Sequence, residues 1–315
     1  MTDAALALFD RAQQWLFEAL LQPLLQALGL ASQAGEVFEG AGWLLAGVLQ
    51  LLFIAVVLGA AERWRPVEPV TDRRAIRTDL LYALIHRLGL FRLGLFFTLD
   101  PLVDALAAQG RLWGWQPWHL DSLWPGLTDI AWVSFALYLV VFDFAGYWLH
   151  RAQHQWRWWW ALHALHHSQR QMNKWSDTRN HVLDDVLVAC AFALLGLVLG
   201  AEPAQFMAIV MLTQLFESLQ HANVRLSFGP LERVWVSPHF HRVHHAIGLG
   251  HEGRAGGHNF GVLLPWWDQL FGSARWHDAV QATGIRDQLS GRDYGEGFWS
   301  QQWLGLQRLW HALRP

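Results

Sequence analysis

Five long apolar stretches limit what this chain can fold into. They occupy residues 41–61, 80–99, 129–149, 182–201 and 203–216 of a 315-residue sequence. The first, third and fourth reach the length of about 20 mostly apolar residues that a helix needs to cross a bilayer. The second is interrupted by His86, Arg87 and Arg92, and the fifth is short. The pattern predicts an all-α, polytopic membrane protein with about four to five transmembrane or hairpin helices. The alternative is a soluble helical protein with a buried core.

Composition agrees with a membrane location and excludes several kinds of partner. Charged residues make up 16% of the chain, against roughly 25% in a typical soluble domain. The formal net charge of −3 provides no basic surface, so we expect no nucleic-acid partner. Cys190 is the only cysteine, which excludes an internal disulfide. The N-terminus lacks the pattern of a cleavable signal peptide.

The remaining segments are assigned around these stretches. Residues 4–31 have a helical pattern interrupted at Pro23, with Asp10, Arg11 and Glu18 among apolar residues. We therefore expect residues 1–35 to form an interfacial amphipathic helix. Residues 36–315 are predicted to form one membrane-embedded domain with a C-terminal cytoplasmic cap. From about residue 222 the chain is rich in Gly, Trp and His, and we expect short helices and loops there.

The distribution of arginine predicts the orientation. Residues 62–78 carry five arginines, whereas residues 100–128 carry only Arg111. The positive-inside rule then places the first of these loops in the cytoplasm. All histidine-rich segments fall on the same side. Because Lys174 is the only lysine, a bias that fits a GC-rich bacterial genome, we expect a multi-pass protein of the bacterial inner (plasma) membrane whose site faces the cytoplasm.

Histidines indicate the chemistry. Thirteen of the 17 fall between positions 150 and 258, in the groups His150-Arg-Ala-Gln-His154, His163-Ala-Leu-His166-His167 and His241-Arg-Val-His244-His245. Residues at i, i+3 and i+4 project from one face of a helix, so each group can present its imidazoles to a common point. Imidazole suits iron, zinc, copper and nickel. The groups contain more nitrogen ligands than one ion can use, which predicts two metal ions.

Other histidines carry weaker signals. His221 shares a helical face with Glu217 and Gln214 in the fifth apolar stretch, which favours a ligand role because such a polar stripe is costly in a membrane. For His181 the ligand and supporting interpretations are equally open. His239, His251 and His258 break the spacing, and we expect supporting or loop positions for them. The other four are interpreted as structural: His86, His119, His277 and His311.

The order of these motifs resembles the fatty acid hydroxylase / sterol desaturase superfamily. HRxxH, HxxHHS, a lone histidine and HxxHH are followed by Asn259-Phe-Gly261 and Trp267-Asp268-x-Leu-Phe271-Gly272. The resemblance spans roughly residues 70–275 and is nearest to the bacterial, alkylglycerol monooxygenase-like branch; His258 before Asn259 departs from it. It implies an integral membrane oxygenase with a cytoplasmic non-haem di-iron site. By position, the implied metal ligands are His150, His154, His163, His166, His167, His241, His244 and His245, with His221 and His181 as further members.

Ligating imidazoles need acceptors that orient their second nitrogen. The candidates for that supporting role are Asp143, Asp184, Asp185, Glu217, Asn223, Asn259 and Asp268, with Arg179 to balance their charge. We expect no catalytic residue beyond the metal ligands.

The predicted reaction is the O2-dependent hydroxylation or desaturation of a C–H bond in a fatty acyl, sterol-like or alkylglycerol-type lipid. No haem-binding or flavin segment is recognisable, so a separate electron donor is expected: a cytochrome, ferredoxin, rubredoxin or pterin. The oligomeric state is open. One alternative is a zinc-dependent membrane lipid hydrolase, but HExxH is absent and the imidazoles are too many. The other is a metal-handling membrane protein, whose ligands should line a path across the bilayer.

Overall fold

The structure is a computed structural model that describes residues 2–249, 251, 256–276 and 279–314. Its regular elements within these ranges are helices, and the single β-bridge found there joins Ala246 and Thr283. The prediction of an all-α fold is confirmed. His277, interpreted above as structural, lies outside the described residues.

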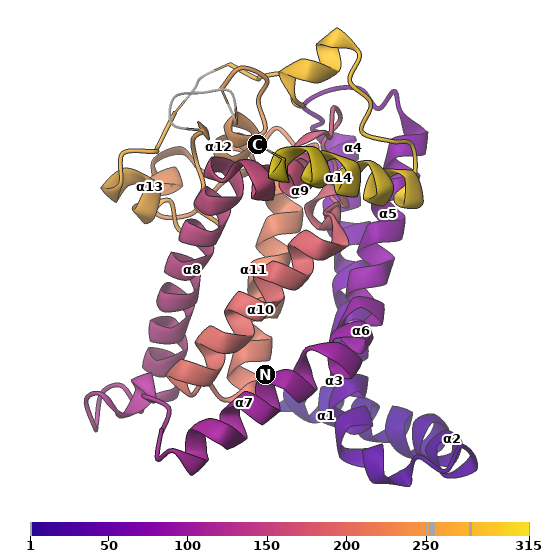
Figure 1. The fold of residues 1–315 in the computed structure, drawn as a ribbon, viewed down its shortest axis with the longest axis vertical. Coiled ribbons are helices and arrows are strands. Elements are labelled where there is room, and N and C mark those ends of the chain that lie inside the picture. The colour runs from indigo at the N-terminus through magenta and orange to yellow at the C-terminus, as the bar shows by residue number, and fades with distance from the viewer. Residues whose placement is uncertain (1, 250, 252–255, 277–278, 315) are drawn as a thin grey trace.

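The long helices run side by side along the longest axis of the molecule (Figure 1). Three are long and apolar enough to cross a membrane, and the bent pair of α5 and α6 would make a fourth; the bend is 48°. The three are residues Ala31–Trp64, which include α3 (Ala34–Phe53), η3 (Ile54–Leu58) and α4 (Gly59–Trp64), then α8 (Ala131–Gln155) and α10 (Val182–Leu199). The bent pair is α5 (Arg73–Arg87) and α6 (Leu90–Thr98).

Local sequence explains where these helices begin and end. The Asp72 carboxylate accepts hydrogen bonds from the backbone N–H groups of Arg74 and Ala75 and so caps the start of α5. Gly89, at φ 78°, separates α5 from α6, because a left-handed residue ends a helix. Gly200, at φ 63°, ends α10 in the same way, and Pro203 starts α11 (Pro203–His221). The fourth and fifth apolar stretches thus form two helices joined by a short turn.

The predicted third stretch ends too early. The helix continues from residue 149 through His150 and His154 to Gln155, because the side of α8 that carries these two histidines packs inward against α9 (Arg157–His167) and α12 (Pro238–His244). His150 and His154 therefore lie within a candidate span, in its last turns.

Short elements cover the two ends of the long helices (Figure 1). At one end lie α9, α12, α13 (Trp266–Leu270) and α14 (Phe298–Leu313), which we call the cap. At the opposite end lie α1 (Thr2–Leu16), α2 (Gln22–Ala27) and α7 (Asp100–Leu112). The chain stays helical through Pro23: η1 (Phe17–Leu21) precedes this residue, and proline is tolerated in the first turn of α2. The 16-residue α14 is longer than the short helices expected after residue 222.

The crossing of α3 and α5 depends on one glycine. A Cβ added to Gly47 of α3 would lie 1.6 Å from the Arg87 carbonyl oxygen of α5. We predict that Gly47→Ala lowers the free energy of unfolding by about 3 kcal/mol or more, because the two backbones must separate. Gly40→Ala on the same helix is the matched control, since an added Cβ meets nothing within 4 Å there. Thermal unfolding in detergent measures both, and equal Tm values would contradict the prediction.

Candidate metal centre

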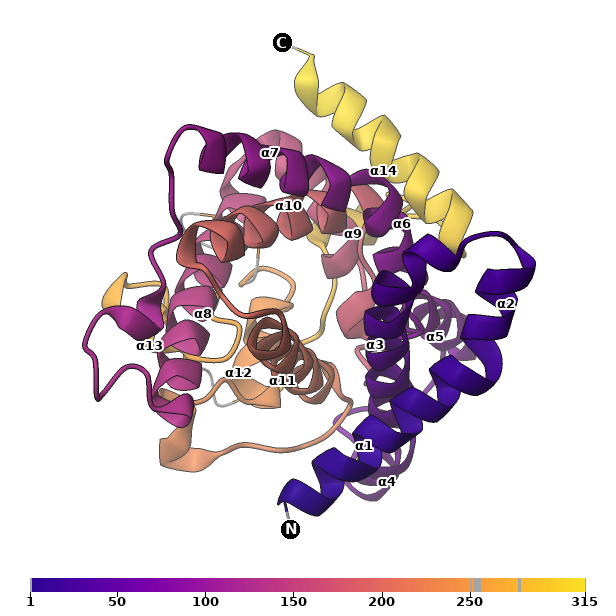
Figure 2. The ribbon, with the colours of Figure 1, turned by 90° about the horizontal axis from the view of Figure 1, so that it is seen from below.

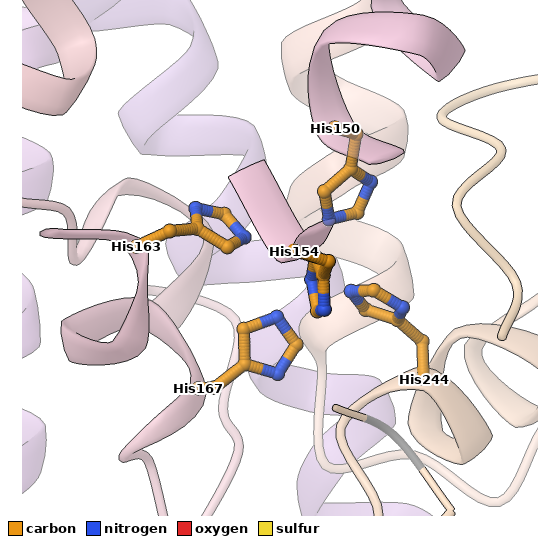
Figure 3. A group of neighbouring side chains, drawn as sticks. All are labelled: His150, His154, His163, His167 and His244. Atoms are coloured by element: carbon orange, nitrogen blue, oxygen red, sulfur yellow. The ribbon is translucent and has the colours of Figure 1, made fainter. Parts of the chain in front are cut away.

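Nine buried or half-buried histidines form two adjacent groups where α8 and α11 meet the cap. The first group comprises His150, His154, His163, His167 and His244, and the second comprises His166, His221, His241 and His245. Within each group the possible ligand nitrogens all lie within 4.8 Å of one another. Figure 3 shows the five imidazoles of the first group turned toward one another from α8, α9 and α12.

The HxxHH motifs are divided between the groups. The i, i+4 pairs stay together, so His163 and His167 of α9 both join the first group. The intervening His166 points to the second group. In α12 the division is reversed, since His241 and His245 join the second group and His244 the first. Each HxxHH motif therefore contributes to both groups, whereas its spacing alone indicates one common point. Only the i, i+4 histidines of a motif belong to the same group.

Backbone carbonyls fix the tautomers of the first group. The Nδ1 atoms of His150 and His244 lie 2.9 and 2.7 Å from the carbonyl oxygens of Phe260 and His258. His154 Nδ1 lies 3.2 Å from the Gly256 carbonyl oxygen. A carbonyl only accepts, so Nδ1 carries the hydrogen and Nε2 keeps the lone pair. Among the described atoms, the buried Nε2 atoms of His154, His163, His167 and His244 have no hydrogen-bond partner.

The second group is held even closer. Three Nε2–Nε2 distances, between His166 and His221, His221 and His241, and His241 and His245, are each 3.1 Å. A metal–nitrogen bond of about 2.1 Å with ligands at right angles places neighbouring nitrogens about 3.0 Å apart. A neutral imidazole nitrogen offers either one N–H or one lone pair, yet the Nε2 atoms of His221 and His241 each face two other nitrogens. One cation shared by the four histidines of the second group would account for these short distances.

Five of these imidazoles are held in the neutral form. Burial, and after it the neighbouring histidines, hold the pKa values of His166, His167, His241, His244 and His245 well below the ordinary value of 6.5. The neutral form is the one that binds a metal. Both groups thus contain imidazoles that can bind a metal ion without first losing a proton.

Asp184 is the carboxylate in direct contact with a member of the first group. Its Oδ2 lies 3.0 Å from His163 Nδ1, and its Oδ1 accepts hydrogen bonds from Gln153 Nε2 and Trp159 Nε1. The carboxylate is 1% exposed. Donors from α8 and α9 therefore hold Asp184, and Asp184 in turn orients His163.

The segment of residues 256–260 presents the carbonyls. Asp268 accepts from the N–H groups of Phe260 and Gly261 and from the Ser273 hydroxyl, while burial raises its pKa to about 6. Asp143 of α8 accepts from the N–H groups of two further residues, Leu263 and Leu264. These two acids act on His150 and His244 indirectly, by holding the backbone segment that contacts them. Because Asp268 belongs to the WDxLFG motif, this support explains the structural role of the motif.

Asn259 supports the same segment. It takes a left-handed conformation, with φ 58°, which asparagine tolerates better than most residues. Its amide donates to the carbonyls of Phe240 and Arg275 and accepts from the Arg275 N–H. The turn places the His258 and Phe260 carbonyls on the side of His244 and His150.

Several predicted residues lie away from both groups. His181 Nε2 lies 2.9 Å from the Gln302 carbonyl oxygen, and its Nδ1 accepts from the Leu183 N–H, so both ring nitrogens are engaged. Asp185 contacts His86. Asn223 holds residues 67 and 68 through their N–H groups. Glu217 reaches His221 only through its backbone carbonyl.

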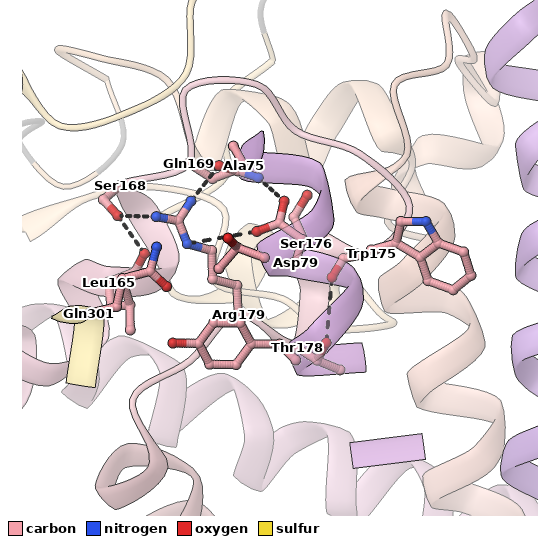
Figure 4. Close-up of polar contacts among 12 residues, drawn as sticks. Ala75, Asp79, Leu165, Ser168, Gln169, Trp175, Ser176, Thr178, Arg179 and Gln301 are labelled. Carbon is pink, nitrogen blue, oxygen red and sulfur yellow. Dashed lines mark hydrogen bonds and ion pairs between the residues drawn. The ribbon is translucent and has the colours of Figure 1, made fainter. Parts of the chain in front are cut away.

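Arg179 lies in a separate buried cluster (Figure 4). Its guanidinium donates to Gln169 Oε1 and to Ser168 Oγ and lies 3.8 Å from Asp79 of α5. Gln169 and Asn173 donate to Asp79 in turn. The cluster ties the chain that directly follows His167 to a candidate span, so Arg179 affects the histidines through the backbone and balances Asp79.

The other histidines of the region lie around the groups. His251 stacks on Trp160, with ring centroids 3.5 Å apart, and lies 5.8 Å from the His154 ring. His239 lies 3.7 Å from Glu232. Sequence reasoning did not identify the Gly256, His258 and Phe260 carbonyls or the Gln153 and Trp159 donors. A backbone carbonyl that orients a histidine cannot be recognised from the sequence, because every residue has a carbonyl group.

Comparison with known proteins agrees with the motif order. Residues 135–273 match the model of the family described as fatty acid hydroxylase. The ornithine lipid hydroxylase OlsE of Rhizobium tropici is 28% identical over 285 residues, which cover 90% of this chain and 82% of that protein. An alkylglycerol monooxygenase of Danio rerio is 27% identical over 84% of this chain and 53% of its own length. A Delta(7)-sterol-C5(6)-desaturase of Nicotiana tabacum is 24% identical over 47% of this chain and 54% of its own. No solved structure matches.

Proposed function

Since residues 135–273 place the chain in the fatty acid hydroxylase superfamily, we propose that it is a di-iron membrane oxygenase that uses O2 to hydroxylate or desaturate a lipid. The observation that best supports this proposal is the pair of adjacent histidine groups, which contain five and four residues. A catalytic zinc needs only about three protein ligands. Nine imidazoles in two groups suit a pair of redox metals better than a hydrolytic zinc.

The residues of this chain would divide the work as follows. The Nε2 atoms of His154 and His244 would bind one metal, and those of His221 and His241 the other. Two iron ions held there would supply the electrons and open positions for O2 activation. Asp184 and the Phe260 carbonyl would keep the Nδ1 hydrogens of His163 and His150 turned outward. These neutral imidazoles would leave the positive charge of the metals uncompensated, whereas carboxylate ligands would cancel part of it.

The position of the ligands supports a lipid substrate. His150 and His154 lie in the last two turns of α8, a candidate span, and His221 is the last residue of α11. A metal held there would lie within a few helical turns of the bilayer core. An acyl chain in that core could thus reach it, while the buried surroundings exclude water from a reactive intermediate. Ornithine lipids and alkylglycerols, named for the relatives above, are candidate substrates.

Orientation and partners belong to the same proposal. The arginines of residues 62–78 lie at the cap end of the molecule, so the positive-inside rule supports a cap in the cytoplasm and an inner-membrane location in a bacterium. Electrons would come from a separate cytochrome, ferredoxin, rubredoxin or pterin. This donor would have to dock on the cap side.

We predict that the iron-loaded protein, given a reductant and O2, converts a lipid in a host extract to a product with one added oxygen atom or two fewer hydrogens. Lipid mass spectrometry with isotopically labelled O2 measures the incorporation. An anaerobic sample is the control and should show no product. Ester hydrolysis without O2 uptake, under every donor system tried, would contradict the proposal and favour the zinc hydrolase.

A further inference from the structure

Helix α14 has its polar and apolar sides reversed relative to a helix on a water-soluble protein. Five large apolar side chains form one exposed stripe at helical spacing, and their exposed fractions range from 43% to 80%. The stripe consists of Trp299, Trp303, Leu306, Trp310 and Leu313. In a protein surrounded by water, such a stripe would face the core. Here it faces outward, which indicates an apolar surrounding phase.

The polar side of α14 faces the protein. Arg308, 8% exposed, donates from Nε to the Ala161 carbonyl of α9. Gln301, 3% exposed, donates to the Gly295 carbonyl. Gly305 lies so close to the His181 ring that an added Cβ would come within 2.2 Å of it. The inward side is thus occupied by specific contacts, and α14 cannot rotate to bury its tryptophans.

Contacts of α14 fix its height relative to the long helices. The Gln302 side chain accepts from the N–H of Val182, the first residue of α10, and donates to the Tyr82 hydroxyl of α5. Both helices belong to candidate spans. Val182 and Leu183, each 37% exposed, continue the apolar surface from α10 toward α14. The helix therefore lies where two spans reach the cap.

Helix α14 runs across the ends of the long helices (Figure 1), and Figure 2 shows it extending outward beyond them. A helix that lies in the plane of a membrane buries its apolar side in the boundary between headgroups and acyl chains. Tryptophan is enriched at that depth. Three tryptophans on one side of α14 match it.

We propose that α14 is an interfacial helix whose tryptophan stripe is inserted into the lipid leaflet on the cap side. The partner is the lipid surface itself. Because Arg308 ties α14 to α9, which carries His163, His166 and His167, the inserted helix sets the depth of both histidine groups relative to the bilayer. The inference concerns membrane placement and stands whatever reaction the metal centre performs.

Cysteine labelling in the full chain tests this proposal. Cys190 is the only cysteine, so a Cys190→Ser background accepts one label at a chosen place. We compare Trp303→Cys, on the stripe, with Gln307→Cys, which is exposed beside it. Each variant carries a polarity-sensitive fluorophore in phosphatidylcholine vesicles with or without brominated acyl chains. We expect blue-shifted emission and quenching by brominated lipid at 303, and quenching by aqueous iodide at 307.

Two outcomes would overturn the proposal. Equal iodide quenching at both positions would mean that the stripe faces water. Blue-shifted emission at 303 without quenching by brominated lipid would mean that a protein surface, such as a second copy of the chain, covers it. Metal content and gel filtration of both variants show separately that the fold and the metal centre are intact.

Discussion

Replacing His154 or His241 by alanine is expected to remove one metal ion each, from different groups. His154 belongs to the first group and His241 to the second, so each variant should keep the ion of the intact group. Loss of a direct ligand exceeds the effect of losing an outer partner, which costs up to about 100-fold. We expect lipid oxidation to fall by at least about 100-fold in both variants, because the proposed oxygen activation uses both metals. Metal analysis of the anaerobically purified chain measures the first effect, and labelled-O2 incorporation the second.

His311→Ala is the matched control for a histidine change in the cap. His311 lies on α14, is exposed, and belongs to neither group. It should keep full metal content and activity. Full metal retention in both His154→Ala and His241→Ala would contradict the assignment of the groups. Loss of both ions in each variant would contradict their independence.

Spacing along the chain predicted which histidines gather but not how they divide. The i, i+4 pairs of one helix share a side, and this local rule holds for His163 and His167. Whether His166 joins them depends on where α11 and α12 cross α9. That crossing is decided by tertiary packing, which leaves no trace within the motif.

His181 illustrates the same limit. Its place before an apolar helix is compatible with a ligand, and nothing local distinguishes that role from a structural one. The structure fills the space beside it with Gly305, more than 120 residues later in the chain, and engages both ring nitrogens. A contact between such distant segments could not be predicted from one sequence.

Charges within the second apolar stretch are similarly ambiguous in the sequence. Arg87 interrupts the stretch and weakens its prediction as a span. In the structure its guanidinium pairs with Asp177 at 2.6 Å, and the same group donates further hydrogen bonds to Gln50, Gln214 and Ser218. A buried charge is tolerated when an opposite charge and hydrogen bonds accompany it, so Arg87 can lie where α3, α5 and α11 meet.

Asp184 and Asp185 are neighbours of identical chemistry, and they offer a paired test of the support around the first group. We predict that Asp184→Asn weakens metal binding and lowers lipid oxidation by about 10–100-fold. Asp184 accepts hydrogen bonds from Gln153, Trp159 and His163. An asparagine has one acceptor oxygen and directs an NH2 group at one of these donors, so His163 loses its orientation.

Asp185→Asn is the control, because Asp185 contacts His86 and not the histidine groups. Asp185 is half-buried and shares with Asp184 the first turn of α10, so any general cost of removing a carboxylate there should appear in both variants. Titration with a chelator measures metal affinity, and Tm separates it from stability. If the two variants lose metal equally, the effect comes from the first turn of α10 as a whole; if only Asp184→Asn does, the carboxylate acts on the centre through His163.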